Sequence, residues 1–448
     1  MPRNHDDLSD IVNELFPSIR RDLETLVRIP SVSLSGHDAD VRRSAEVTRD
    51  LLGGAGLQNV QLLELDGAHP AVFGETPAPE GAPTILLYAH HDVQPPGPQS
   101  LWTSPPFEPE ERNGRLYGRG VSDDKAGIAV HLGAIRAHGG KPPVGVKVFV
   151  EGEEEVGSTH LEAFIDEYRE LLAADAIVIA DSGNWRVGVP TLTTSLRGLV
   201  DLEIEIRTLE KGVHSGMFGG VLPDALSALC RTLASLHNDD GSVAVPGLVH
   251  SESDPLDLTE AELRSQAGAL DSTKLIGNGS LTARTWSQPA ISVLAIDAPP
   301  IDEAINQLIP SARAKVSMRL APGQDPFDAM DALERHVVAN VPWGAEVNIE
   351  RGSTGDAIAL DTDGPAYEVF RNAFRMAWGA DTVEIGVGGS IPFVAAFQDA
   401  YPKAAILLTG VGDPTSRAHG PDESQDLDEL RRGVVAEAIA LRLFAGTT

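Results

Sequence analysis

Short apolar runs alternate with amphipathic stretches from residue 8 to residue 180 of the chain. Apolar, β-prone runs bounded by turn residues predict buried strands, and apolar positions three and four residues apart predict helices. The predicted helices span residues 8–27, 41–52, 126–138 and 161–172. The predicted strands span residues 60–65, 84–88, 144–150 and 176–180. Pro17 lies inside the first helical run, where a proline can split a helix.

Strands that alternate with helices predict an α/β domain whose mainly parallel sheet is covered by helices on its faces. In such sheets, functional residues gather at the carboxyl ends of the strands. His90, the run Glu153–Glu155 and Asp181 each follow a predicted strand closely. We therefore expect these side chains to lie along one edge of the sheet.

The pattern changes near residue 190. Apolar and polar residues alternate in 200–207 and again in 316–320, which is typical of antiparallel strands with one solvated face. A helix is predicted for residues 223–236, with Cys230 on its inward side, and residues 240–290 are polar enough to predict helices and loops without a clear order. This stretch indicates a separate α+β domain with an antiparallel sheet.

The α/β pattern resumes at Pro326. Helices are predicted for residues 326–340, 365–378 and 427–441, and a strand for residues 405–409. The chain is therefore expected to form one α/β domain from residues 1–189 and 322–448, with the second domain, residues 190–321, inserted into it.

Composition and charge narrow the possible functions. An apolar fraction of 42% suffices for ordinary cores, and the net charge of −31 disfavours nucleic acid and anionic membranes as partners. The single cysteine, Cys230, excludes an intrachain disulfide and a thiolate metal cluster, and its apolar surroundings predict a buried thiol. The sequence shows neither a signal peptide nor a transmembrane stretch, so we expect a soluble, cytoplasmic protein.

Acids and histidines at or near the predicted strand ends are the candidate functional residues. They are His90, Asp123, Glu154, Glu155, Asp181 and His419. Carboxylates that converge on one edge repel each other unless cations are present, and imidazole with carboxylate suits Zn²⁺, Mn²⁺ or Co²⁺. Taken singly, each acid could equally be a helix cap or a turn residue. Their shared position after strands favours a metal site.

Eight segments carry a resemblance to a known family. They read YAHHDVQPP, LWTSPPFEP, LYGRGVSDDK, EGEEEVGS, GVHSGMFGG, MRLAPG, GGSIPF and RAHGPDE, in family order between residues 88 and 423. The chain resembles the di-zinc aminoacylase/carboxypeptidase-type metallopeptidases, in the branch of carnosinase and the cytosolic nonspecific dipeptidase. The resemblance implies two divalent metal ions, dipeptide hydrolysis, and an inserted domain that serves as a lid and forms a homodimer.

The resemblance also implies the metal ligands. His90 and Asp181 would bind the first metal, Glu155 and His419 the second, and Asp123 would bridge the two. Such bridged pairs generate a nucleophile from water near neutral pH. The peptide bond between Asp123 and Asp124 is expected to be cis.

Other residues are assigned by the same resemblance to the reaction itself. Asp92 would orient His90, and Glu154 would act as the general base. Glu153, in the same acidic run, would take no part. The family usually has Gly and Tyr where this chain has Ala89 and His91. His91 could be a stray ligand, but its side chain should point away from that of His90 because the two are neighbours on a strand.

The substrate residues implied by the resemblance lie later in the chain. His214 would stabilise the oxyanion in the active site of a partner subunit, although it could simply be a loop histidine. Arg319 would hold the substrate carboxylate, although it could equally be a solvent-facing residue of an alternating strand. Gly388, Gly389 and Ser390 could donate hydrogen bonds to the same carboxylate, or simply form a turn.

Three functions fit this sequence. The first is hydrolysis of dipeptides by a metal-activated water, with Glu154 as the base. The second keeps the metal site but acts as an N-acyl amino acid deacylase or as a carboxypeptidase. The third, a metal-dependent binding protein without activity, is disfavoured because every implied ligand and the base are present.

Overall fold

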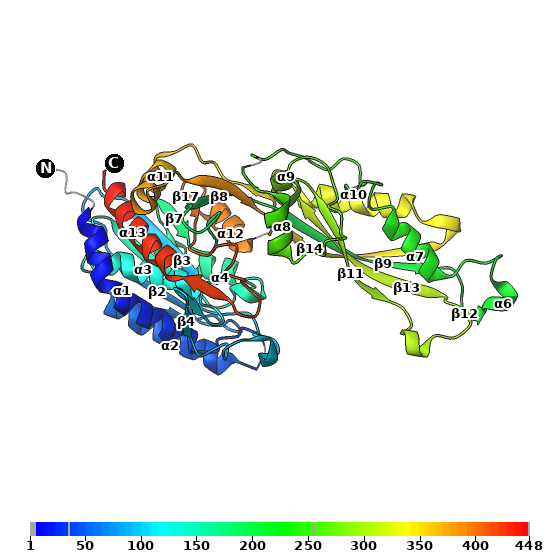
Figure 1. Cartoon of the computed structure of the whole chain (residues 1–448), viewed down its shortest axis with the longest axis horizontal. Coiled ribbons are helices and arrows are strands. Elements are labelled where there is room, and N and C mark those ends of the chain that lie inside the picture. The colour runs from blue at the N-terminus through cyan, green and yellow to red at the C-terminus, as the bar shows by residue number, and fades with distance from the viewer. Residues whose placement is uncertain (1–5, 35, 255, 390, 447–448) are drawn as a thin grey trace. The chain divides into compact units, whose positions relative to one another are not determined.

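The computed structural model describes the chain except residues 1–5, 35, 255, 390 and 447–448, and divides it into two compact units (Figure 1). Unit 1 comprises Met1–Thr194, Leu360–Ile385 and Pro392–Thr448. Unit 2 comprises Ser195–Ala359 and Gly386–Ile391. Among the described residues, no helix has the combined length and apolar character needed to cross a membrane.

A nine-stranded mixed sheet forms the centre of unit 1, in the order β1-β2-β6-β3-β7-β17-β8-β15, with β16 also paired to β8. Its strands are β1 (Gln58–Leu63), β2 (Ala71–Thr76), β3 (Thr84–His90), β6 (Gly145–Glu151), β7 (Ala176–Ile179), β8 (Thr191–Leu196), β15 (Ile358–Ala359), β16 (Val383–Val387) and β17 (Ala405–Leu408). The inner strands β6, β3, β7 and β17 run parallel. The chain passes from one unit to the other within β8, directly after β15 and again within β16.

Helices cover both faces of this sheet, because alternate residues of a strand point to opposite faces. On one face, Ile85 and Leu87 pack in a core shared with helices of both chain ends. These helices are α1 (Asp6–Val27), α2 (Asp38–Gly54), α3 (Lys125–Ala137), α11 (Pro365–Trp378) and α13 (Leu427–Phe444). On the other face, the ring of Tyr88 stacks on Phe393, and Phe149 contacts Phe164. Phe393 belongs to α12 (Pro392–Ala400), and Phe164 belongs to α4 (Leu161–Glu167).

Unit 1 also contains a short helix and a small three-stranded sheet. The helix is α5 (Arg169–Leu172), and the sheet joins β4 (Glu110–Arg112), β5 (Arg115–Tyr117) and β18 (Ser424–Asp426) in the order β18-β5-β4. In the pairing of β18 with β5, Gln425 lies opposite Leu116. The loops on either side of β5 and β18 are thereby brought together although they lie far apart in the sequence.

Unit 2 is built on a four-stranded antiparallel sheet in the order β11-β13-β9-β14. Its strands are β9 (Gly198–Arg207), β11 (Ala290–Asp297), β13 (Ser311–Leu320) and β14 (Glu346–Gly355). Helices α7 (Ala225–Ala234) and α10 (Pro326–Ala339) bury their apolar sides against one face of this sheet (Figure 1). The remaining elements are β10 (Val213–His214), α6 (Ser215–Phe218), α8 (Glu260–Ala267), α9 (Leu281–Trp286) and β12 (Gln307–Leu308).

The fold class is confirmed, with a mainly parallel sheet between helices and a separate antiparallel sheet. The second boundary differs from the expected one, because residues 322–359 lie in unit 2 rather than in the unit that holds the parallel sheet. In α10, Met330 and Leu333 pack on the antiparallel sheet of unit 2. An amphipathic helix has the same sequence pattern whichever sheet it covers, so its periodicity could not place it.

Three local expectations also need correction. The first helix runs unbroken through Pro17, which lies on its exposed side, so the apolar stripe still packs. The helix expected at residues 161–172 is two helices, since the backbone leaves helical geometry at Tyr168. Cys230 is exposed rather than inward. Its neighbour Leu229 fills the core instead, because consecutive residues of a helix point about 100° apart.

Gly133 lets three helices approach closely in unit 1, and this close packing generates a stability prediction. A Cβ at this position would lie 2.6 Å from Cγ1 of Val434 and 2.8 Å from Cδ1 of Ile19. We expect Gly133→Ala to lower the free energy of unfolding, because overpacking costs about 1–3 kcal/mol and outweighs the gain in helix propensity. Gly53→Ala, in open space on α2, should raise the free energy of unfolding by up to about 1 kcal/mol. Urea unfolding of both variants measures the difference, and equal midpoints would contradict the packing argument.

Candidate active site

The candidate active site of unit 1 is assembled at the carboxyl ends of three neighbouring parallel strands. His90 is the last residue of β3, and its register partner Glu151 is the last residue of β6. Glu154 and Glu155 follow β6 in a turn of 3₁₀ helix, and Asp181 follows β7. Because the strand order is β6-β3-β7, these side chains meet at one edge of the sheet, as the strand pattern predicts.

Two groups of three possible metal ligands share one residue, Asp123. In the first group, Nε2 of His90 lies 3.1 Å from Oδ1 of Asp123 and 4.0 Å from Oδ1 of Asp181. In the second, Nε2 of His419 lies 3.0 Å from Oδ2 of Asp123 and 3.1 Å from Oε2 of Glu155. The two oxygens of Asp123 therefore face different groups, which is the arrangement of a bridging carboxylate.

These distances fit a shared cation in each group. Ligand atoms of a tetrahedral site with bonds of about 2.0–2.1 Å lie about 3.3 Å apart. Each group contributes one imidazole and two carboxylates, a donor set that suits Zn²⁺, Mn²⁺ or Co²⁺ and contains no thiolate. The chain thus has a candidate dinuclear metal centre.

Electrostatics at this centre favour positive charge. Burial and the charge of Asp123 raise the pKa of Asp181 to about 7, and burial with the charge of Asp181 raises the pKa of Glu154 to about 9. Hydrogen bonds with Asp123 and Glu155 raise the pKa of His419 to about 10. Burial acts against ionisation of Asp123, but hydrogen bonds from His419 and His90 hold the pKa of this carboxyl well below its usual value. Crowded carboxylates of this kind are stabilised by cations.

Asp92 is fully buried and connects the first histidine to the acidic turn after β6. Its Oδ1 lies 3.3 Å from Nδ1 of His90, whose Nδ1 also lies 3.1 Å from the Asp92 carbonyl oxygen. Its carboxylate accepts hydrogen bonds from the backbone N–H groups of Glu154 at 3.3 Å and of Glu155 at 3.0 Å. One carboxylate can thereby orient the imidazole and fix both glutamates, a common arrangement around metal ligands.

The three glutamates of the turn have different environments. Oε1 of Glu155 accepts the N–H of Gln94 at 3.0 Å, which leaves Oε2 facing His419. Glu153 turns away and accepts from the N–H of His69 at 2.8 Å and from Nδ1 of His160 at 2.8 Å. Glu154 belongs to neither ligand group, and among the described residues its carboxylate has no hydrogen-bond partner.

His91 is buried and takes no part in the ligand groups. Its Nε2 lies 2.9 Å from the carbonyl oxygen of Pro70, and burial lowers the pKa of this imidazole to about 4. Asp124, which the sequence did not single out, accepts the N–H of His90 at 3.2 Å and caps α3 through the N–H of Gly127. The peptide bond between Asp123 and Asp124 is cis, as the family resemblance implies.

Unit 2 holds the expected substrate residues. His214 ends β10 and is exposed, and its Nδ1 accepts the N–H of Gly216 at 3.0 Å. Arg319 lies on β13, half-buried, and among the described residues its guanidinium has no ion-pair or hydrogen-bond partner. Gly388 and Gly389 form the turn after β16, and Ser390 lies outside the described residues.

Arg197 is a residue of this region that the sequence analysis missed. Burial and the charge of Arg319 lower its pKa to about 10. Its guanidinium donates to the carbonyl oxygens of Gly388 at 3.3 Å, Arg284 at 3.3 Å and Gln288 at 3.2 Å. Two arginines that have no carboxylate partner among the described residues favour a bound anion. In the sequence, the feature that could have pointed to Arg197 is its position, with Gly198, just before a predicted strand.

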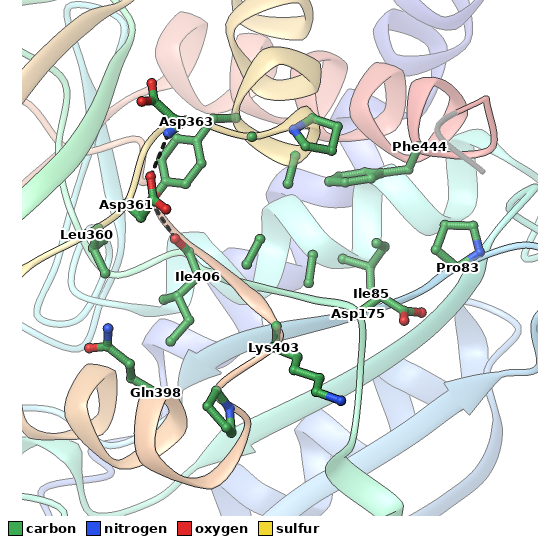
Figure 2. Close-up of a pocket in the computed structure, with 18 residues that line it drawn as sticks. Pro83, Ile85, Asp175, Leu360, Asp361, Asp363, Gln398, Lys403, Ile406 and Phe444 are labelled. Carbon is green, nitrogen blue, oxygen red and sulfur yellow. Dashed lines mark hydrogen bonds between the residues drawn. The ribbon is translucent and has the colours of Figure 1, made fainter.

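A cavity of about 450 Å³ in unit 1 lies away from this chemistry. Figure 2 shows Ile85, Asp175 and Ile406 at its wall, from the starts of β3, β7 and β17, with Lys403 nearby. It therefore opens at the amino ends of the strands, opposite the ligand groups. None of the predicted site residues lines it.

Comparison with known proteins identifies the class of protein to which this chain belongs. The sequence profile of Peptidase family M20/M25/M40 matches residues 86–442. The chain belongs to this family of peptidases, enzymes that hydrolyse peptide bonds.

Two named relatives and one solved structure refine the comparison. The chain is 38% identical over 366 residues to the cysteinylglycine-S-conjugate dipeptidase of Corynebacterium striatum, which covers 80% of each chain. It is 27% identical to the Cys-Gly metallodipeptidase dug1 of Schizosaccharomyces pombe, over 97% of each chain. The dipeptidase Dug1p of Saccharomyces cerevisiae matches with a TM-score of 0.81 over 100% of both chains, and its 23% identity makes this a likeness of fold.

The shared position of Asp123 predicts how metal content responds to mutation. We expect Asp123→Ala to lose both metals, because it removes a ligand from each group, and His419→Ala to keep one. Glu153→Gln should bind as much metal as the unaltered protein, since Glu153 faces His69 and His160. Mass spectrometry of the protein-bound metal, after dialysis with Zn²⁺ or Mn²⁺, gives the stoichiometry. Retention of both metals by Asp123→Ala would contradict the bridging arrangement.

Proposed function

We propose that this protein is a di-metal dipeptidase in which Glu154 is the general base. The observation that carries the proposal is the position of Asp123, whose two oxygens face two separate histidine–carboxylate groups. Glu154 is held beside these groups by Asp92 and belongs to neither. A carboxylate next to a metal pair and free of it is suited to proton transfer.

The roles of the individual residues follow from this arrangement. His90, Asp123 and Asp181 hold one cation, and Asp123, Glu155 and His419 hold the other. Bound there, two divalent cations lower the pKa of water and polarise a carbonyl group.

Glu154 carries the proton through the reaction. It accepts a proton from the attacking water and delivers it to the leaving amine, so it returns to its starting state after each turnover. Asp92 fixes the orientation of His90 and the position of the Glu154 backbone. Zn²⁺ is the expected metal, with Mn²⁺ and Co²⁺ as alternatives.

The substrate is proposed to be a dipeptide whose terminal carboxylate binds Arg319. The half-buried guanidinium of Arg319 has no carboxylate partner among the described residues, and Arg197 adds a second positive charge. The turn at Gly388 and Gly389 is anchored by Arg197, which supports a role in the same carboxylate site. The dipeptidase names of the two relatives support the choice of a dipeptide.

A homodimer through the edge strand β11 is proposed from the surface of unit 2. β11 ends the four-stranded sheet, so one side of its backbone has no strand partner within the described part of the chain. Val293, Leu294 and Ile296 on this strand are 42%, 58% and 48% exposed. A long apolar edge strand of this kind pairs readily with a second chain. A second copy of β11 is the simplest partner, because antiparallel pairing of the two edges satisfies a twofold axis.

His214 is proposed to act in the active site of the partner subunit. It lies in unit 2 directly before α6, where Met217 is 75% exposed, and Val221, just after this helix, is 85% exposed. Exposed apolar side chains around a histidine are typical of a surface that is covered during function. As a hydrogen-bond donor to the oxyanion, His214 would stabilise the transition state by several kcal/mol.

Replacement of the general base tests the proposed mechanism. Glu154→Ala should lower kcat by about 10²–10⁴-fold with both metals still bound, because only the proton carrier is lost. Glu153→Gln is the matched control in the same turn and should keep kcat close to that of the unaltered protein. Unchanged turnover by Glu154→Ala would contradict the role of Glu154.

A substrate panel tests the proposed specificity. Metal-free protein reconstituted with Zn²⁺, Mn²⁺ or Co²⁺ is assayed on Cys-Gly, β-Ala-His, tripeptides and N-acetyl amino acids. Dipeptides should give the highest kcat/KM, and Arg319→Met should raise KM for them more than it lowers kcat. Preference for N-acetyl amino acids or for longer peptides would instead identify the deacylase or the carboxypeptidase.

Hybrid dimers test the action of His214 across the subunits. His214→Ala and Glu154→Ala should each be nearly inactive alone. Mixed in equal amounts, they should recover about a quarter of the full activity, because half of the dimers are hybrids with one intact site. Leu294→Glu, placed on β11 in both chains, should abolish the recovery by preventing pairing of the edges. Absence of recovery while labelled subunits are seen to exchange would rule out the role in trans.

A further inference from the structure

Glu423 lies on the loop before β18, and its side chain is fully buried. Its Oε2 accepts from Nη1 of Arg119 at 2.6 Å and from the N–H of Gly120 at 2.9 Å. Its Oε1 accepts from the N–H of Ser122 at 3.0 Å and of Asp123 at 3.2 Å. One carboxylate thus binds four donors of a single loop, and the last of these donors belongs to the bridging residue of the candidate metal centre.

Arg119 extends the same contact to the other side of the centre. Arg119 is 1% exposed, and its Nη2 donates to the carbonyl oxygens of His419 at 3.1 Å and Gly420 at 3.4 Å. His419 has a φ of +62°, in the left-handed region that residues other than glycine rarely adopt. The hydrogen bonds from Arg119 therefore hold a backbone conformation that the chain would otherwise avoid.

Further contacts immobilise Arg119 itself. Its N–H donates to the carbonyl oxygen of Pro106 at 2.7 Å, and its guanidinium lies 5.4 Å from the ring centre of Trp102. The neighbouring N–H of Gly118 donates to the carbonyl oxygen of Glu423 at 3.0 Å. The loop that carries Asp123 and the loop that carries His419 are thereby joined through backbone and side-chain contacts.

We propose that the buried ion pair of Arg119 and Glu423 is a positioning device that sets the separation of Asp123 and His419, and so creates the second metal site. The inference rests on the proposed two-metal function. Neither residue belongs to a ligand group, so both act through the ligands. A planar guanidinium and a carboxylate can hold two loops at one distance and angle, which a single point charge cannot do.

The geometry predicts a selective effect on the two metals. Among the described residues, the pair contacts the backbone of Asp123 and of His419, and neither His90 nor Asp181, which complete the first group, is hydrogen-bonded to it. Loss of the pair should weaken binding of the second metal more than of the first, because the pair holds two of the three ligands of the second group, Asp123 and His419, and only Asp123 of the first. A pair that served only stability would weaken both sites together, in proportion to unfolding.

Titration of the metal-free full-length protein with Mn²⁺, followed by electron paramagnetic resonance, tests this proposal. The unaltered protein should bind two ions per chain and give the signal of a coupled pair. Glu423→Gln should show the signal of a single ion, with the second ion bound at least about tenfold more weakly, as is usual when a residue supporting a ligand is lost. Arg119→Lys should weaken the second ion in the same way. Glu423→Asp, which keeps the charge but shortens the reach, applies the same test if Glu423→Gln does not fold.

Two control variants separate positioning from stability. Glu437→Gln removes another buried carboxylate, which faces His131, and Asp422→Asn removes the neighbouring carboxylate, which binds Thr103. Both controls should bind two ions, even where thermal unfolding shows that Glu437→Gln is as destabilised as Glu423→Gln. Binding of the second ion by Glu423→Gln within about twofold of normal, or its equal loss in Glu437→Gln, would overturn the proposal. Fewer than two ions in the unaltered protein would overturn the proposed function itself.

Discussion

The crowding of carboxylates at the carboxyl ends of β3, β6 and β7 is the constraint on which the rest of unit 1 depends. Asp123, Glu155 and Asp181 face two histidines at distances of 3.0–4.0 Å. Such a cluster is unfavourable in a buried setting unless positive charge is bound there. The surrounding hydrogen bonds then serve a single purpose, because each of them holds a ligand or its loop in the one arrangement that two cations can share.

Support for the candidate ligands comes from carboxylates that belong to neither ligand group. Asp92 holds the turn of Glu154 and Glu155, and Asp124 holds the N–H of His90. Glu423 holds the loop of Asp123 in a comparable way. A buried carboxylate that accepts several backbone N–H groups is rigid, since each hydrogen bond removes freedom from both partners. The acidic composition is thus partly accounted for by residues that support the centre rather than bind metal.

The proposed reaction divides its residues between the two units. The ligand groups and Glu154 belong to unit 1, whereas His214, Arg319 and Arg197 belong to unit 2. The two units have separate hydrophobic cores, so each set of residues is supported by the packing of its own unit.

The sequence by itself determined the parallel strands, their polar ends and most helices, including the bounds of α11 at residues 365 and 378. These features follow from local periodicity and from turn residues, which act within a few positions of the chain. Only the tertiary structure placed Cys230 at the surface, assigned α10 to unit 2 and brought Arg119 to Glu423. The last contact joins residues some 300 positions apart. No local pattern encodes such a pairing, since it depends on how the completed sheet and its loops pack.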